Sequence, residues 1–195
     1  MSSLKGLNLG YALCGSFCTF SKSIATIQQL VDLGVNVFPI MTENAYTTDT
    51  RFGDAKDIIN KIETITGKKI IHTIEAAEPL GPKDIVDAIV IAPCTGNSLG
   101  KLNNAICNTA PLLGAKSLMR NGKPVVICLC TNDGLGTSLK NLGGMFSKKG
   151  VFFVPFGQDN PQKKPYSLVG DFSQVVATLE LALEGKQIQP MFVKY

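Results

Sequence analysis

The chain has 195 residues, of which 45% are hydrophobic and 17% are charged, and its formal net charge is +4 at pH 7. We expect a globular protein with a single domain over residues 1–195, and the composition excludes a disordered or fibrous chain. The basic residues are scattered rather than clustered with aromatic ones, which disfavours a nucleic-acid partner. The apolar runs are far shorter than the roughly 20 residues that cross a bilayer, and no secretory leader is recognised. We therefore expect a cytoplasmic protein with no membrane partner.

The hydrophobic period switches repeatedly between strand-like runs and helix-like faces, a pattern that predicts a parallel sheet with crossover helices. Buried apolar runs predict strands at 7–14, 35–41, 87–92, 125–130 and 151–156, with a short additional strand at 69–73. Apolar residues at helical spacing predict helices at 24–31, 58–65, 99–106, from 111 onward, 135–146 and 171–185, before an extended tail over 186–195. The predicted fold class is α/β.

The cysteine and histidine content excludes or disfavours several classes of catalytic site. The six cysteines include no C-x-x-C pair, and four of them lie within or at the ends of apolar runs, so we expect buried thiols in a reducing compartment. The chain has one histidine, His72, so it cannot build a His-rich zinc site by itself. Neither serine nor cysteine is accompanied by a nucleophile elbow and a second histidine, which disfavours acyl-enzyme hydrolysis.

The loop after the first predicted strand suits an anion. Ligands of an open parallel sheet bind beyond the carboxyl ends of its strands. Here Gly15, Ser16 and Thr19 lead into a helix, whose free N–H groups and dipole favour a phosphate. The glycine spacing matches neither a dinucleotide fingerprint nor a P-loop, which leaves a mononucleotide phosphate held by hydroxyls, Ser21 among them. An ordinary helix N-cap explains the same residues equally well.

Three further strand ends carry hydroxyl and amide side chains: Thr42; Thr95, Asn97 and Ser98; and Asn132. Such groups suit a phosphate, a ribityl chain or the edge of a heterocyclic ring, although they also cap loops in any α/β protein. The coincidence of four small, polar strand ends favours a binding site. Asn132 could bind a substrate carboxylate or polarise a carbonyl, or it could form an Asx turn.

His72 is the side chain whose unperturbed pKa lies nearest neutrality. A lone histidine is more often structural than catalytic. Its place near the end of the short predicted strand 69–73 favours a position facing the ligand crevice, where Glu75 would orient it.

Taken together, these loops resemble those of the homo-oligomeric flavin-containing cysteine decarboxylases, a superfamily of FMN flavoproteins that includes phosphopantothenoylcysteine decarboxylase and flavin prenyltransferase. The most specific segment is APCTGNSLGK at 92–101, similar to the family's A-P-x-[ST]-A-N-T-x-x-K segment, followed by NTAPLL at 108–113. Gly15, Ser16 and Lys22 match its phosphate loop, Thr42 its second-strand motif, and His72 its catalytic histidine. The resemblance covers roughly residues 7–156. It implies a three-layer Rossmann-like fold with about six parallel strands, FMN at a subunit interface, and a trimer-based homo-oligomer.

The chain also departs from this family. Its decarboxylases carry P-x-M-N-x-x-M-W after the fifth strand and a clamp cysteine near the C-terminus. Here Asn132 alone carries over from the first motif, and no cysteine follows Cys130. These losses argue against cysteine decarboxylation. Because His72 matches the family's catalytic histidine, the resemblance still implies that it transfers a proton or assists a hydride step near the flavin.

Three segments, 10–19, 131–135 and 158–165, resemble one branch of the superfamily in particular. In that branch the flavoprotein is one of the two components of a heteromeric enzyme. The resemblance implies a small cyclic dicarboxylate as substrate, dehydration plus two-electron oxidation as the reaction, and a nicotinamide-binding Rossmann protein as partner. Alternatives are a flavin-dependent decarboxylase or prenyltransferase, and a non-catalytic component that supports its partner.

The candidate site residues follow from these loops and this resemblance. We expect His72 and Asn132 to be catalytic and Lys101 or Lys163 to meet the substrate carboxylates. FMN is expected to contact Gly15, Ser16, Thr19, Thr42, Thr95, Asn97 and Ser98.

Overall fold

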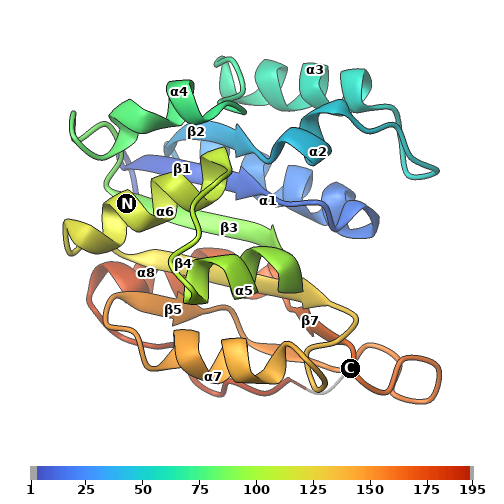
Figure 1. Ribbon diagram of the computed structural model, residues 1–195. Helices are drawn as coiled ribbons and strands as arrows, with labels where there is room; N and C mark the ends of the chain where they lie inside the picture. Colours follow the sequence, from blue (N-terminus) through green and yellow to red (C-terminus); the bar gives the residue numbers. More distant parts are fainter. Residues whose placement is uncertain (1–3, 194–195) are drawn as a thin grey trace.

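A seven-stranded, mostly parallel sheet with helices on both faces forms the fold of residues 4–193, which the computed structural model describes (Figure 1). Its strands are β1 (Asn8–Leu13), β2 (Asn36–Met41), β3 (Ala88–Cys94), β4 (Val125–Thr131), β5 (Val151–Phe153), β6 (Phe156–Gly157) and β7 (Leu168–Gly170). Their order is β2-β1-β3-β4-β7-β6, and β5 also pairs with β4. The predicted α/β class is confirmed.

The strand order reverses beside β1. The chain leaves β1 for β2 on one side and then returns to β3 on the other, with all three strands parallel. The loops that follow β1 and β3 consequently diverge onto opposite faces, which opens a crevice between them at the carboxyl edge of the sheet. The topology places the candidate ligand site at this point.

Strand β4 changes neighbours along its length. Val125, Val126 and Ile127 pair in parallel with β5, whereas Cys130 and Thr131 pair in antiparallel fashion with β7. Strand β7 in turn pairs with β6. The segment 158–167 therefore connects two strands that are both held in the sheet.

Two helical layers cover the sheet. One contains α1 (Phe20–Asp32), α3 (Ala55–Thr66) and α8 (Val175–Leu183), and the other contains α4 (Ile74–Ala77), α5 (Gly96–Asn103), α6 (Ala110–Arg120) and α7 (Leu139–Phe146). In Figure 1, α5, α6 and α7 lie in front of the sheet and α1 and α8 behind it. Short elements connect the rest: α2 (Glu43–Thr47), η1 (Phe17–Thr19), η2 (Glu78–Leu80) and η3 (Phe172–Gln174).

Within residues 4–193 no helix has the length and apolar character needed to span a membrane.

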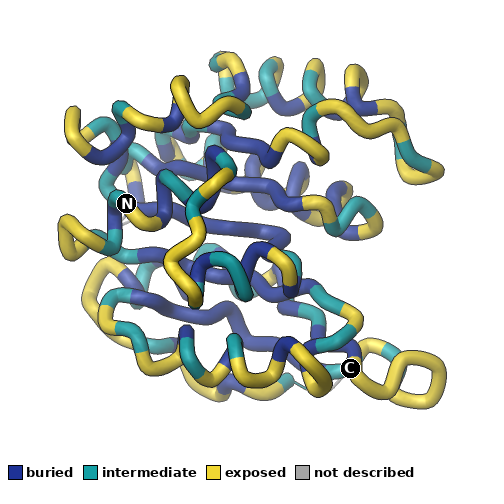
Figure 2. Tube along the Cα trace, in the orientation of Figure 1, coloured by how far each residue is buried: buried dark blue, intermediate teal, exposed yellow. Residues whose placement is uncertain are grey.

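The central strands are apolar on both faces because each face meets a helical layer. On β1, Leu9, Tyr11 and Leu13 pack toward α1, while the intervening Ala12 packs toward the other layer. Figure 2 shows the resulting continuous burial of the strands. This pattern explains why the apolar runs were sufficient to predict β1 to β4.

The predicted short strand at 69–73 is wrong. Ile71 forms a single parallel bridge with Ile40, through hydrogen bonds from Ile71 N to Pro39 O and from Met41 N to Ile71 O, both 2.9 Å. Thr73 then caps α4, so the chain turns away from the sheet after one pairing.

The end of the sheet also differs from the prediction of about six parallel strands. The predicted strand 151–156 ends at Phe153 as β5, and Pro155, which lacks an N–H donor, separates it from β6. Strands β6 and β7 add antiparallel pairing that the apolar runs did not indicate.

Three helices are shorter than predicted. Helix α7 starts at Leu139 because residues 133–138 form turns around Asp133 O. Helix α5 ends at Asn103, which leaves Ile106 exposed. The predicted helix 171–185 is η3 followed by α8, and the predicted tail 186–195 lies partly outside the described residues.

Candidate functional site

Two adjoining cavities occupy the carboxyl edge of the sheet, with volumes of about 650 and 330 Å³. Both are lined by Gly15, Thr95 and Asn97, which come from the loops after β1 and β3. The cavities therefore meet at the point where the strand order reverses. Both volumes lie within the range of about 300–1,000 Å³ that is usual for small-molecule sites.

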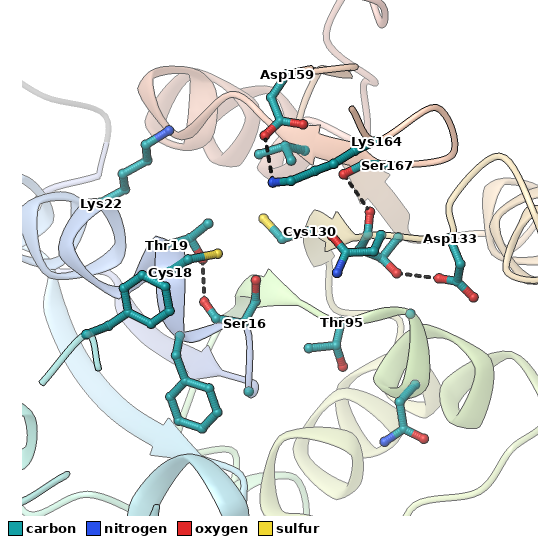
Figure 3. Close-up of a pocket in the computed structure, with 18 residues that line it drawn as sticks. Ser16, Cys18, Thr19, Lys22, Thr95, Cys130, Asp133, Asp159, Lys164 and Ser167 are labelled. Atoms are coloured by element: carbon teal, nitrogen blue, oxygen red, sulfur yellow. Dashed lines mark hydrogen bonds and ion pairs between the residues drawn. The ribbon is translucent and has the colours of Figure 1, made fainter. Parts of the chain in front are cut away.

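The larger cavity has walls from several parts of the chain besides the loop after β3. The β1–α1 connection contributes Ser16, Phe17 and Thr19, and the end of β4 contributes Cys130 and Asn132. Another wall is the segment after β6, where Figure 3 shows Asp159 paired with Lys164 and Ser167 bonded to the end of β4. Six predicted residues thus lie together here: Gly15, Ser16, Thr19, Thr95, Asn97 and Asn132.

A hydrogen-bonded network holds the loop after β4 in place. Asp133 accepts hydrogen bonds from Thr131 Oγ1 and, at 2.9 Å, from Ser138 Oγ. A Cβ at Gly96 would lie within 2.8 Å of oxygens from all three of these side chains, so glycine is needed for this close approach. The loops after β3 and β4 therefore pack directly against each other. Asp133, rather than the neighbouring Asn132, makes the turn contacts.

The smaller cavity is lined mainly by hydroxyl, amide and charged side chains from the start of α2, from α5 and from the start of α6: Thr42, Glu43, Asn44, Asn97, Ser98, Lys101 and Thr109. Thr109 Oγ1 is buried and has no hydrogen-bond partner among the described residues. A buried polar group without a partner costs about 1–3 kcal/mol. This oxygen fits a ligand that brings its own hydroxyl or phosphate oxygens.

Two of the predicted contact residues also cap helices. Thr42 accepts a hydrogen bond from Ala45 N at 3.3 Å at the start of α2. Thr95 accepts one from Ser98 N at 3.1 Å and donates to Ser98 Oγ at 3.0 Å at the start of α5. Both side chains therefore have a structural role as well as a place on the cavity wall.

Buried thiols lie directly behind the site. Burial raises the pKa of Cys14 to about 11, with the Ser98 hydroxyl acting in the opposite direction. The pKa of Cys130, on the wall of the larger cavity, is instead lowered, because the thiol of Cys128 and the N–H of Gly170 donate to its sulfur and Lys22 lies nearby. Cys128 lies deeper, and burial raises the pKa of its thiol.

His72 lines neither cavity. Its Nδ1 lies 3.3 Å from Glu43 Oε2, and its ring stacks on Tyr46 with a centroid separation of 3.7 Å. Glu43 lines the smaller cavity, so His72 lies just behind that wall. The expected partner Glu75 is not the one found. Within one chain, His72 and Asn132 do not face a common cavity.

Sequence reasoning identified the strand-end residues but missed others. Lys101 lines the smaller cavity, whereas Lys163 lines neither; the adjacent Lys164 lines the larger one. Phe52 and Thr109 were also missed, since their loops reach the cavities only through tertiary packing. For Cys130, the available signal was its position as the last buried residue of an apolar strand.

A parallel sheet with a crevice at its switch point is typical of Rossmann-like folds, many of which bind nucleotides or flavins there. The chain belongs to the flavoprotein family, whose model matches residues 1–143. It is 46% identical over 194 residues to the B subunit of dipicolinate synthase from Bacillus subtilis, a match that covers 100% of this chain and 97% of that protein. The predicted resemblance to that branch of the family is confirmed.

Solved structures agree with this assignment. A crystal structure of the B subunit of dipicolinate synthase from Bacillus halodurans matches with a TM-score of 0.91 and 44% identity, over 99% of both chains. The FMN-dependent cysteine decarboxylase SpaF matches with a TM-score of 0.69 and 22% identity, over 92% of this chain and 99% of that one. At that identity the second match shows the shared fold alone.

Proposed function

We propose that this chain binds FMN and serves as the B subunit of a dipicolinate synthase. The observation that carries the proposal is the pair of adjoining cavities at the switch point of a chain that matches such a protein over its whole length. The other solved relative described above is itself FMN-dependent. In this proposal residues 1–195 act as a single domain.

The two cavities suit different parts of the cofactor. The hydroxyl and amide groups of Thr42, Asn97, Ser98 and Thr109, with the charge of Lys101, suit the phosphate and ribityl chain. The larger cavity has Phe17 and Phe52 among its walls, and there Gly15, Ser16, Thr19 and Thr95 would contact the flavin ring. This assignment differs from the resemblance, which gave Gly15, Ser16 and Lys22 to the phosphate, because the hydroxyl groups of Thr42, Ser98 and Thr109 and the charge of Lys101 lie together in the smaller cavity. FMN, when bound, supplies an acceptor for two electrons.

Asn132 and His72 would serve the substrate. Asn132 lines the larger cavity, where its carboxamide can bind a carboxylate or a carbonyl oxygen. The contact between His72 Nδ1 and Glu43 orients the ring, so that Nε2 can accept or deliver a proton. Because His72 lies outside the cavities of its own chain, it would act at a site completed by a second copy, as a trimer-based homo-oligomer provides.

The substrate would be a cyclic dicarboxylate of the lysine pathway, which dehydration and two-electron oxidation convert into dipicolinate. The A subunit of dipicolinate synthase, resembling a nicotinamide-binding Rossmann protein, would be the partner that shares these steps. The complex would work in the cytoplasm of a sporulating mother cell.

The visible absorption spectrum of the purified chain, followed by titration with FMN, tests the proposal. We expect stoichiometric flavin binding that Thr109→Val weakens about tenfold through the loss of one hydrogen bond, with no loss of stability, because the hydroxyl has no protein partner among the described residues. Thr64→Val, on the exposed surface of α3, is the matched control.

A colourless protein that ignores added FMN would refute the flavin proposal. If such a protein still stimulated the A subunit, its role would be that of a non-catalytic supporting component. Binding of a thiol substrate or a prenyl phosphate would instead favour a decarboxylase or a prenyltransferase.

A further inference from the structure

Two lysines stand on different walls of the larger cavity. Lys22 comes from α1 and Lys164 from the segment after β6, and Figure 3 shows the two side chains approaching the cavity from opposite sides. Among the described residues Lys22 forms no ion pair, whereas Lys164 Nζ lies 3.6 Å from Asp159 Oδ2. Both oxygens of Asp133 are already taken by hydroxyl groups. The cavity therefore presents to a ligand the ammonium group of Lys22 and the ammonium group of Lys164 that Asp159 accompanies, while the carboxylate of Asp133 bonds to its own loop.

The segment that carries Lys164 is held in place although its side chains are largely exposed. Lys164 N donates to Asn160 O at 2.8 Å, and Lys164 O accepts from Ser167 N at 3.1 Å. Tyr166 O accepts from Leu135 N at 2.9 Å, and Ser167 Oγ donates to Thr131 O at 3.2 Å. These bonds fix the backbone at Lys164 against the end of β4. The neighbouring Lys163 does not reach the cavity wall.

The match to the family model includes some walls of the larger cavity and leaves out others. The flavoprotein model covers residues 1–143, which include every residue of the smaller cavity and Lys22. Asp159, Lys164, Ser167 and Val169 of the larger cavity lie beyond it. The part that the family model matches therefore contains the whole smaller cavity, whereas the wall with Lys164 lies outside the matched residues.

We propose that Lys22 and Lys164 form a clasp for the two carboxylates of a planar cyclic dicarboxylate, and that Asp159 positions Lys164. Two carboxylates on one ring need two cations at a distance from each other, and charge-assisted hydrogen bonds to each provide the selectivity over a monocarboxylate. This inference rests on the proposed function for the class of substrate, but it does not require the flavin to be present.

Binding of pyridine-2,6-dicarboxylate and pyridine-2-carboxylate to the full chain tests the clasp. Calorimetry in metal-free buffer, with and without FMN, is suitable because the dicarboxylate chelates metals. We expect the dicarboxylate to bind at least tenfold more tightly than the monocarboxylate. Lys22→Met and Lys164→Met should each reduce that preference about tenfold, Lys164→Arg should retain most of it, and Lys163→Met should leave it unchanged.

Equal binding of the two ligands by the parent protein, or equal effects of Lys164→Met and Lys163→Met, would overturn the inference, and so would the absence of any dicarboxylate binding. The two proposals fail separately. Normal FMN binding without a dicarboxylate preference refutes the clasp alone, whereas a clear dicarboxylate preference in a chain that ignores FMN refutes the flavin proposal alone. Because both lysines are exposed, unchanged thermal unfolding of the variants will show that the fold is intact.

Discussion

Gly96 begins helix α5 beside three oxygen atoms of the loop after β4. A Cβ at this position would lie 2.5 Å from Thr131 Oγ1, 2.7 Å from Ser138 Oγ and 2.8 Å from Asp133 Oδ1. Any side chain would push apart the two loops that build the larger cavity. The backbone contact at Gly96 thus connects local packing with the geometry of the site.

Replacing Gly96 with alanine should lower the free energy of unfolding by about 1–3 kcal/mol, the usual cost of overpacking. Gly143→Ala in α7 is the matched control, since a Cβ there meets no heavy atom within 4 Å. That variant should be neutral or more stable by up to about 1 kcal/mol through helix propensity. Urea unfolding of both variants measures the difference, and equal stabilities would contradict the packing argument.

The acidity of Cys130 gives a pH-dependent prediction. Hydrogen bonds from Cys128 and Gly170 favour its thiolate, so its pKa lies below the ordinary 9.0, while burial raises the pKa of Cys14 to about 11. Since alkylation requires the thiolate, Cys130 should react with iodoacetamide at a lower pH than Cys14, as followed by mass spectrometry of the folded protein. Reaction of Cys14 before Cys130 would show the assignment to be wrong.

Substitution of Lys22 tests the cause of the lowered pKa of Cys130. Its positive charge stabilises the Cys130 thiolate, so Lys22→Met should raise the pKa of Cys130 and move its alkylation to higher pH. Lys163→Met, which removes a lysine outside the cavity, should leave the profile of Cys130 where it is.

At the level of elements, two threonine N-caps allow the structural role of Thr95 to be distinguished from its proposed role in binding. Thr95 caps α5 on the cavity wall, and Thr73 caps α4 away from both cavities. Valine at either position should destabilise the protein by about 1 kcal/mol, the usual cost of a lost N-cap. Only Thr95→Val should also weaken FMN binding. Thermal unfolding and flavin titration of both variants test this, and unaltered FMN affinity in Thr95→Val would leave Thr95 with a capping role alone.

Elements that bury a whole face could be predicted from the sequence, and elements that depend on distant partners could not. The apolar runs of β1 to β4 and the helical spacing of α1 and α3 were sufficient because burial on both faces or on one stripe determines their pattern. Strands β6 and β7 have two and three residues, too few for a period, and their pairing depends on the path of the segment between them.

The same limit applies to the site. The switch-point rule brought the strand-end hydroxyls to one edge, and the structure places them around two adjoining cavities. Lys164 escaped prediction because nothing in an irregular segment tells which of two consecutive lysines faces inward. His72 lies behind Glu43 rather than at a cavity wall, because the predicted strand before it is a single bridge.

At the scale of the whole molecule, several large apolar side chains are exposed in the single chain. Leu139 is 49% exposed and Phe192 is 77% exposed, and the Phe192 ring packs edge-on against Phe156. Exposed apolar side chains of this size suit an interface with other copies. We expect sedimentation equilibrium to give a mass that is a multiple of three times the 20.8 kDa chain. A 20.8 kDa species at micromolar concentration would rule this assembly out.

The divided pairing of β4 indicates where the chain tolerates changes in length and sequence. Both ends of the segment 158–167 are fastened by β6 and β7, while β4 is independently braced by β3 and β5. Insertions into a surface connection of this kind cost little, because the penalty for closing a longer loop grows only slowly with its length. A change in this one stretch would therefore alter the wall that carries Lys164 and leave the smaller cavity, which residues 15–112 build, as it is.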